Sequence, residues 1–424
     1  MPEPDKALSE SSLRARGEFF RHSGWMMIAG IIGGTFAWGV HFLAKRMSPA
    51  EYGLFGALMA LTMCVPAMPL QMAFTHQTAS AVAGGRERQL AGLIRVFCGG
   101  ALAIWVIVVL AMVAFRREIF FRWEVANPTA FWVMLPFLLI TMWMPVLSGM
   151  LQGRQNFLWL GWTALISSGT RVLIAAIAVL GFGAGAAGMM TGVLIGSLAG
   201  LVLTLWQTCD LWSGSSEPSN WRQVLRETVP LLVGFGAFQL FFSVDTLFAK
   251  AYFGAEEVGY YTSAGILSRA LMWVVGPLAQ VMFPRIVHSH AKSEKTDIVP
   301  LVFAGTAILA IVGAVGLSVV GPWVIHFVYG SQFATAAKLL PWYAAAMVPL
   351  TLANVLLSNL LARGSYRLLP FLVALAPAYL LGITQFHASM IQLLQVFGVA
   401  NTLLLATCAY VNWREHKARK DEVS

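Results

Sequence analysis

Two ionisable side chains, Asp245 and Arg269, lie inside apolar segments on either side of a short polar turn, Gly254 to Glu257. Each segment is long enough to cross the ~30 Å hydrocarbon core of a membrane, which needs about 20 helical residues. A charged side chain at that depth costs roughly 2.5–3.5 kcal/mol on insertion scales, so it usually faces a partner or a water-filled cavity. We therefore expect the chemistry of this chain to lie between residues 228 and 286.

Arginine is suited to one particular task inside a membrane. Arg269 lies about ten residues from one end of its segment, which is ~15 Å at the helical rise, and Arg171 lies at a similar depth in an earlier segment. A guanidinium presents a fork of donors that matches phosphate oxygens. We predict that Arg171 and Arg269 bind a phosphate-bearing substrate. The alternative is a structural arginine that pairs with an acid or with backbone carbonyls, or that extends toward the interface.

Asp245 has two interpretations that the sequence leaves open. Its depth differs from that of Arg269 by ~6 Å, which an arginine side chain can span across a hairpin. Asp245 can be a gate or a protonatable coupling site that responds to a proton or sodium gradient. It can equally form a buried ion pair with Arg269 that fixes helix packing.

Weaker candidates are polar side chains in other apolar segments. They could line a polar path by hydrogen bonding, but they could equally bond between helices, and an interfacial histidine is more often inert. These candidates are His41, Gln239, Gln280, Asn354 and Asn359. We predict no metal and no cofactor, because His288 and His290 have no further ligand nearby and the four cysteines lack metal-binding spacing.

The composition indicates a polytopic membrane protein. Of 424 residues, 58% are hydrophobic and 11% are charged, and the mean hydropathy is +0.72. A soluble core of this size does not need so many uncharged runs of membrane-spanning length. The net charge of +9 comes from basic residues scattered singly at segment ends, a distribution that is unlike a nucleic-acid interface and typical of anchoring at the cytoplasmic side.

Twelve spans account for the apolar runs. With the N-terminus in the cytoplasm, nineteen of the 28 Lys and Arg fall in cytoplasmic segments, so the positive-inside rule favours both termini inside. The predicted spans are residues 24–44, 53–75, 93–115, 130–150, 157–181, 184–207, 228–251, 258–284, 298–321, 338–361, 367–385 and 388–412.

The two halves of the chain repeat each other. Glu51 to Phe55 matches Glu257 to Tyr261, and Pro69-Leu70 matches Pro277-Leu278 at nearly the same offset. Because six spans bring each half back to its starting side, the repeats are parallel, and we expect two all-α bundles around a central cavity. The predicted organisation is a cytoplasmic N-terminal segment (1–23), a first six-helix bundle (24–207), a cytoplasmic linker (208–227), a second six-helix bundle (228–412) and a basic cytoplasmic tail (413–424).

The turn Ser48-Pro49-Ala50-Glu51-Tyr52-Gly53-Leu54-Phe55 resembles the polysaccharide-export branch of the multidrug/oligosaccharidyl-lipid/polysaccharide exporter superfamily. The stretch Phe253 to Tyr261, followed by Phe283-Pro284-Arg285, resembles the second hairpin of that family, and Leu151-Gln152-Gly153-Arg154 is a weaker match.

This resemblance implies a Wzx-type flippase of a bacterial inner membrane that works by alternating access. The implied substrate is an undecaprenyl-pyrophosphate-linked oligosaccharide, a precursor of surface polysaccharide such as O-antigen, lipopolysaccharide or exopolysaccharide. A polysaccharide polymerase and glycosyltransferases are the implied partners.

Two alternatives remain. A multidrug exporter of the same superfamily needs an acidic cavity for cationic drugs, whereas the predicted interior has two arginines and one aspartate. A membrane-embedded glycosyltransferase or polymerase generally needs sizeable outer loops with catalytic acids. The predicted outer loops 116–129 and 322–337 are short, and the second has no acid. We therefore predict transport without enzymatic activity.

Overall fold

The computed structural model describes residues 25–26, 28–125, 127–217, 221–272, 299–362 and 365–421. Within these ranges the chain is helical and has no strand, and the described part of each predicted span is largely helical, with a break inside the span 53–75. Among the described helices, ten are long and apolar enough to cross a membrane, and α14 (Leu369–Gln385) is a shorter apolar helix. The all-α, multi-pass membrane fold predicted from the sequence is thus confirmed. The cytoplasmic position of both termini stays a prediction.

The chain divides into two compact units. Unit 1 takes its residues from Met1–Leu43, Ala67–Phe115 and Thr129–Val224. Unit 2 takes its residues from Ala44–Pro66, Arg116–Pro128 and Leu225–Ser424. The helix at residues 49–63 therefore belongs to unit 2, the unit that also contains residues 225–424. The predicted division at residues 208–227, with a six-helix bundle on each side and a cavity between them, stays a prediction.

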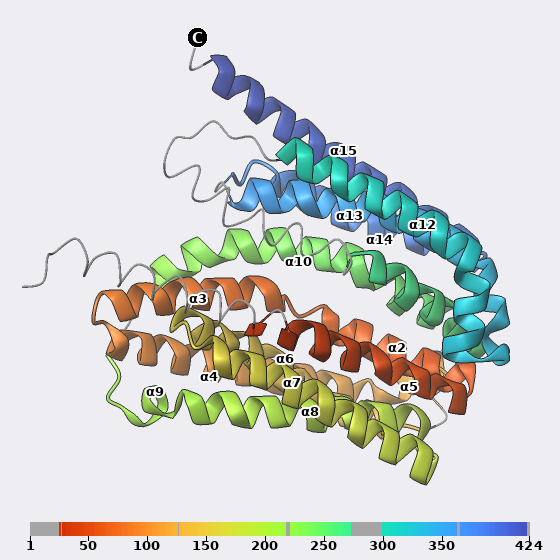
Figure 1. Ribbon diagram of the computed structural model, residues 1–424, viewed down its shortest axis with the longest axis horizontal. Coiled ribbons are helices and arrows are strands. Elements are labelled where there is room, and N and C mark those ends of the chain that lie inside the picture. Colours follow the sequence, from red (N-terminus) through yellow and green to blue (C-terminus); the bar gives the residue numbers. More distant parts are fainter. Residues whose placement is uncertain are drawn as a thin grey trace, which may run out of the picture. The chain divides into compact units, whose positions relative to one another are not determined.

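Unit 1 is built on the pairs α7–α8, α3–α6 and α6–α8, which lie side by side (Figure 1). Its core joins α3, α4, α6 and α8 through buried side chains that include Phe74, Leu93, Met150 and Leu201. The unit contains, in chain order, helical residues 28–39, α3 (Ala67–Ala83), α4 (Glu87–Ala114), α6 (Thr129–Gly153), α7 (Phe157–Ala176), the π-helical turn η2 (Ile177–Gly181), α8 (Gly185–Gln207) and α9 (Cys209–Ser213).

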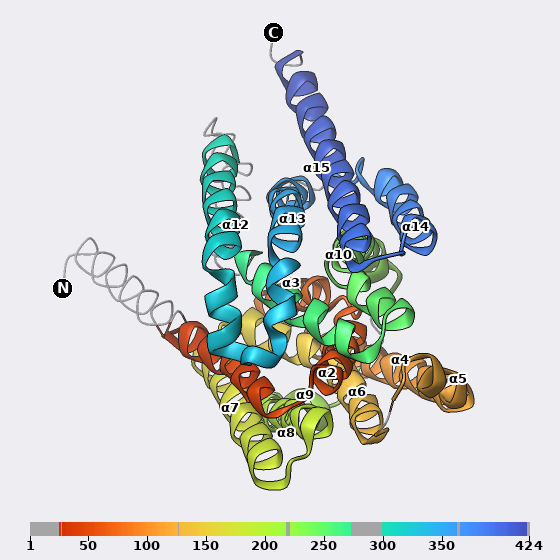
Figure 2. The ribbon, with the colours of Figure 1, turned by 90° about the vertical axis from the view of Figure 1, so that its right-hand side faces the viewer.

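Unit 2 centres on α13, which packs on α15 and α12, while α14 packs on α15 (Figure 2). The first 3₁₀ turn, η1 (Val40–Arg46), leads into this unit. Its further elements are α2 (Pro49–Met63), α5 (Arg116–Arg122), α10 (Trp221–Tyr252), helical residues 255–272, α12 (Val299–Tyr329), the 3₁₀ segment η3 (Ser331–Lys338), α13 (Leu340–Ala362), α14 and α15 (Met390–Asp421).

Two boundaries differ from the sequence prediction. The predicted span 53–75 is two helices, α2 and α3, which are separated at residues 64–66. Pro66 lacks the amide hydrogen that a continuous helix needs and disfavours helical backbone at the residue before it. In contrast, α10 begins at Trp221, inside the segment predicted as linker, because residues 221–227 contain no Gly or Pro and several good helix formers.

The family-like turn before α2 is a helix start with a defined structure. The Ser48 hydroxyl accepts a hydrogen bond from the Glu51 amide, and the Glu51 carboxylate accepts one from the Ser48 amide, both at 3.3 Å. This reciprocal capping box satisfies two amides that otherwise lack intrahelical partners. Pro49 occupies the first helical turn, where its missing amide hydrogen is not needed.

The two repeated motifs pack directly against each other within unit 2. A Cβ atom on Gly259 would lie 2.0 Å from the Pro49 carbonyl oxygen, and one on Gly53 would lie 2.7 Å from the Gly259 amide nitrogen. No side chain fits at such distances, so glycine at both positions is what lets α2 and residues 255–272 approach. Tyr52 is fully buried beside this contact, with its hydroxyl 3.4 Å from that of Tyr329.

Candidate functional site

Asp245 and Arg269 form an ion pair between two helices of unit 2. Asp245 is on α10 and is fully buried, and Arg269 is on the helix of residues 255–272. The Arg269 Nη2 atom lies 2.8 Å from Asp245 Oδ1. The depths inferred from helical rise predicted that Arg269 could reach Asp245. The two side chains are in contact, as in the ion-pair interpretation of Asp245.

Two tyrosines complete the surroundings of the Asp245 carboxylate. The Tyr261 hydroxyl donates to Asp245 Oδ2 at 2.9 Å, and the Tyr343 hydroxyl of α13 donates to the same oxygen. The carboxylate therefore accepts three donors although it has no exposure to solvent. A buried anion is stable only with such full hydrogen bonding and a nearby positive charge.

Arg269 has hydrogen-bond partners besides Asp245. Its Nε atom donates to the Phe242 carbonyl at 2.9 Å, Nη2 also donates to the Thr246 hydroxyl at 3.0 Å, and the guanidinium lies 5.4 Å from the ring centroids of Phe242 and Tyr343. Gly265 leaves room for this arrangement, because a Cβ there would lie 3.0 Å from Arg269 Nη1. Arg269 therefore has both partners expected of a structural arginine, the acid Asp245 and the backbone carbonyl of Phe242.

Tyr379 of α14 borders the same cluster. Its ring stacks on Phe241 at 5.0 Å between centroids, its side chain is buried, and among the described residues its hydroxyl has no hydrogen-bond partner. It lines a cavity of about 400 Å³ whose other walls include Gln395 of α15. Sequence reasoning missed Tyr261, Tyr343 and Tyr379. Position within a span was no signal: Tyr261 and Tyr343 lie near the start of the predicted spans 258–284 and 338–361, and Tyr379 lies near the end of 367–385.

Arg171 and His41 both belong to unit 1. Arg171 is half-buried on α7, where the chain packs closely against α8: a Cβ on Gly192 would lie 2.6 Å from the Arg171 carbonyl oxygen, and one on Gly196 would lie 2.8 Å from Arg171 Cβ. His41 lies within electrostatic range of Arg171. Arg171 and Arg269 are in different units, and their joint binding of one head group stays a prediction.

The remaining candidates fall into three groups. Asn359 of α13 donates to the Asn412 side chain of α15 at 2.6 Å, so it bonds between helices. Asn354 and Gln239 are half-buried on α13 and α10, and their part in a sugar path stays a prediction. The others, Gln280, His288 and His290, lie outside the described residues. Within the described ranges no group of His, Cys, Asp or Glu has the arrangement of a metal site.

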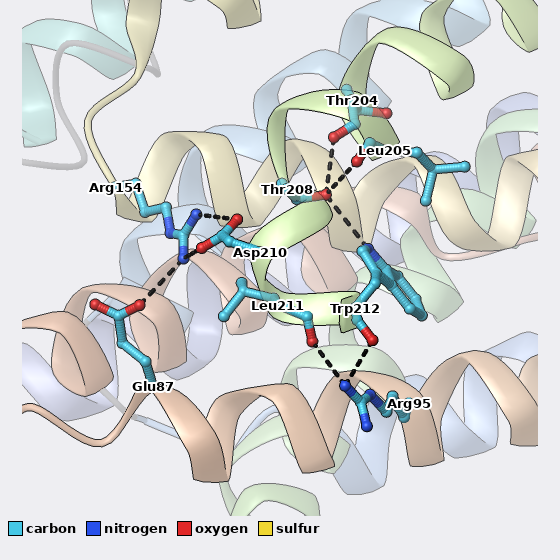
Figure 3. Close-up of polar contacts among 9 residues, drawn as sticks. All are labelled: Glu87, Arg95, Arg154, Thr204, Leu205, Thr208, Asp210, Leu211 and Trp212. Atoms are coloured by element: carbon cyan, nitrogen blue, oxygen red, sulfur yellow. Dashed lines mark hydrogen bonds and ion pairs between the residues drawn. The ribbon is translucent and has the colours of Figure 1, made fainter. Parts of the chain in front are cut away.

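Unit 1 holds a second polar network, centred on the Arg154 of the weaker family-like motif (Figure 3). Its guanidinium donates to both carboxylate oxygens of Asp210 on α9, at 3.0 and 2.6 Å, and to Glu87 of α4 at 3.2 Å. These hydrogen bonds hold the pKa of Asp210 below its ordinary value of 3.8 and raise that of Arg154. They fasten α9 to α4 and to the end of α6.

Arg95 of α4 fastens the other end of α9. Its Nη2 atom donates to the carbonyls of Leu211 and Trp212 at 3.2 and 2.7 Å (Figure 3). The same atom also donates to the carbonyl of Gly214. A cation suits this place, because the last carbonyls of a helix lack intrahelical partners and carry partial negative charge. The start of the segment predicted as a linker is therefore bound to unit 1.

Long apolar helices with a hydrogen-bonded ion pair between two of them are those of a polytopic membrane protein. The sequence profile of the polysaccharide biosynthesis protein family matches residues 19–290, and the chain belongs to this family. The resemblance noted in the turn before α2 is thus confirmed at the level of the family.

Solved structures share the fold. The chain is similar to an inward-facing multidrug resistance MATE family transporter of the MOP superfamily, with a TM-score of 0.75 and 13% identity over 91% of this chain and 95% of that one. It is also similar to the lipid II flippase MurJ in an inward closed conformation, with a TM-score of 0.69 and 15% identity over 92% of this chain and 87% of that one.

The matches to curated proteins cover a smaller part of the chain. The chain is 27% identical over 216 residues to the uncharacterized proteins Rv3630 of Mycobacterium tuberculosis and Mb3654 of Mycobacterium bovis. The match covers 49% of this chain and 49% of each relative, so the chain spans about half the length of the curated relatives it matches.

Proposed function

We propose that this protein translocates a lipid-linked, pyrophosphate-bearing oligosaccharide across a bacterial inner membrane by alternating access. The observation that carries the proposal is a buried arginine, Arg269, held by Asp245 inside a transporter fold whose family is named for polysaccharide biosynthesis. The similarity to a lipid II flippase supports the same class of substrate. In this proposal the isoprenoid tail stays in the bilayer while the protein carries the head group.

In the proposed mechanism, the Asp245–Arg269 pair responds to substrate. A pyrophosphate has more negative charge than a carboxylate and matches the guanidinium fork, so it competes with Asp245 for Arg269. Tyr261 and Tyr343 then keep the released carboxylate hydrogen-bonded, which lowers the cost of the exchange. Asp245 is the proposed gating or coupling residue, since an anion that loses its cation gains affinity for a proton or sodium ion.

Arg171 is the proposed second contact for the pyrophosphate. Because it belongs to unit 1, a head group that meets both arginines binds one conformation of the protein better than another. Such differential binding is what a ligand needs to shift a conformational equilibrium. Coupling to a proton or sodium ion and the assistance of a polysaccharide polymerase and glycosyltransferases belong to the same proposal.

The test of this function is a deletion strain. Loss of the protein is expected to make lipid-linked oligosaccharide accumulate in the cytoplasmic leaflet while its synthesis continues. Arg171→Ala should reproduce the accumulation at normal protein levels, and Arg269→Ala should reproduce it per molecule of protein in the membrane, whereas lysine at either position should keep partial activity through its charge. Normal surface polysaccharide in the deletion strain, with no redundant exporter present, would overturn the proposal. Export of a cationic drug instead would favour the multidrug alternative.

A further inference from the structure

A second cationic pocket lies in unit 2, at the start of α14 and near the end of α15. Its volume is about 410 Å³, and it contains two arginines, Arg367 and Arg414. Both side chains are exposed, and neither forms a hydrogen bond or an ion pair with any described residue. The two guanidiniums therefore present their donors to whatever enters the pocket.

The rest of the pocket is mostly apolar. Its walls include Phe371 and Tyr410, which are 44% and 49% exposed, together with Pro370 and the buried Val411. Among the described residues, Glu415 is the one acid that lines it, and its carboxylate accepts a hydrogen bond from the Ser365 hydroxyl. The lining therefore combines two positive charges with one negative charge and an exposed aromatic wall.

The pocket lies where one apolar helix begins and the apolar part of another ends. Arg367 directly precedes the apolar helix α14, and Arg414 follows the apolar part of α15. Phe371 and Tyr410 lie on the apolar side of these arginines along both helices. A ligand that fits this order has an anionic end beside the arginines and a hydrocarbon chain that continues along α14 and α15 into the bilayer.

We propose that this pocket receives the diphosphate end of an isoprenoid lipid before translocation, as a loading site separate from Arg171 and Arg269. This inference rests on the proposed function. A diphosphate has two phosphate groups and can engage one guanidinium with each, whereas a glycerophospholipid has a single diester phosphate. The aromatic wall takes the first isoprene units. The pocket lies beside the basic tail, which is on the side where the predicted topology places the cytoplasm.

The test uses the full-length protein in nanodiscs of phosphatidylcholine, titrated with farnesyl diphosphate by calorimetry. Arg367→Gln and Arg414→Gln are each expected to weaken binding by about tenfold or more, because each removes charge-assisted hydrogen bonds. Arg226→Gln is the matched control, since Arg226 is also exposed in unit 2 and does not line the pocket. Unchanged melting temperatures would show that the variants fold, as expected for surface positions.

The outcomes separate this inference from the function on which it rests. Farnesyl diphosphate binding that survives Arg171→Ala and is lost in the double variant of Arg367 and Arg414 supports a separate loading site. Binding that is lost in Arg171→Ala and kept in the double variant overturns the loading site and leaves the proposed function intact. Equal competition by phosphatidylglycerol or by inorganic pyrophosphate also overturns it, because the pocket would then recognise any anionic lipid or free phosphate.

Discussion

A carboxylate inside the apolar part of a membrane protein has to be neutralised, hydrogen-bonded or both. Asp245 is both, with Arg269 on one oxygen and two tyrosines on the other. Its proximity to Arg269 could be predicted, because a short turn joins their segments and helical rise fixes their depths. The tyrosines could not: Tyr343 comes from α13, much later in the chain, and Tyr261 lies near the start of its predicted span, so only tertiary packing places either hydroxyl on Asp245.

A double-mutant comparison separates the structural and functional roles of this pair. Arg269→Leu or Asp245→Leu alone leaves an uncompensated buried charge, which costs of order 3–5 kcal/mol, whereas replacing both can be nearly neutral. Each single variant should therefore lower membrane abundance and the melting temperature, and the double variant should restore both.

The transport activity of the double variant then distinguishes a substrate-binding role of Arg269 from a purely structural one. If Arg269 binds substrate, the double variant is abundant and inactive. A double variant that recovers activity together with abundance would make the pair purely structural, and a fully active Arg269→Leu variant would remove Arg269 from the site.

At the scale of elements, the sequence repeat predicted which helices of the two halves are equivalent, but it did not predict that they are in contact. The matched motifs around Gly53 and Gly259 could be predicted to occupy equivalent helices. That they touch each other depends on α2 grouping with unit 2, which no local pattern records. Similarly, the polar composition after α8 indicated a linker, but the contacts of Arg95 and Arg154 with α9 depend on residues distant in the sequence.

Alanine at Gly259 should destabilise the protein strongly. Its Cβ would overlap the Pro49 carbonyl oxygen, which is backbone and cannot move aside without shifting α2. Overpacking of this kind typically costs about 1–3 kcal/mol. Gly316→Ala is the control, since a Cβ at this position of α12 meets nothing within 4 Å. We expect a lower melting temperature for Gly259→Ala and little change for the control. Equal melting temperatures would mean that α2 and residues 255–272 do not pack as described.

The attachment of α9 should depend on pH through Asp210. Its pKa is depressed in the folded protein, so the Arg154–Asp210 contact stabilises the fold above pH 3.8 and is lost as the pH falls through the lower folded value. A fluorine label on Cys209, which is exposed, reports the transition by NMR once the other cysteines are replaced by serine. Arg154→Gln should move the midpoint up toward 3.8. An identical midpoint in both proteins would exclude Arg154 as the cause.

At the scale of the whole molecule, the fold class could be predicted almost completely. Apolar runs of spanning length leave few alternatives to a helical bundle, because every backbone amide in lipid has to be bonded within its own segment. The function was harder to predict from the sequence, because the candidate site residues are single polar side chains whose partners come from other helices. The Arg367–Arg414 pocket illustrates the difficulty: in the sequence these two residues are merely basic ends of spans.

Reconstitution into liposomes shows whether the protein moves a pyrophosphate-linked oligosaccharide between the two leaflets. Purified protein is incorporated into liposomes that contain a pyrophosphate-linked oligosaccharide, and a glycosidase added outside measures how much sugar is accessible. A flippase should make nearly all of it accessible, whereas empty liposomes and Arg269→Ala should expose only the outer-leaflet fraction. If the wild-type protein leaves the accessible fraction equal to that of empty liposomes, the protein does not translocate this class of lipid.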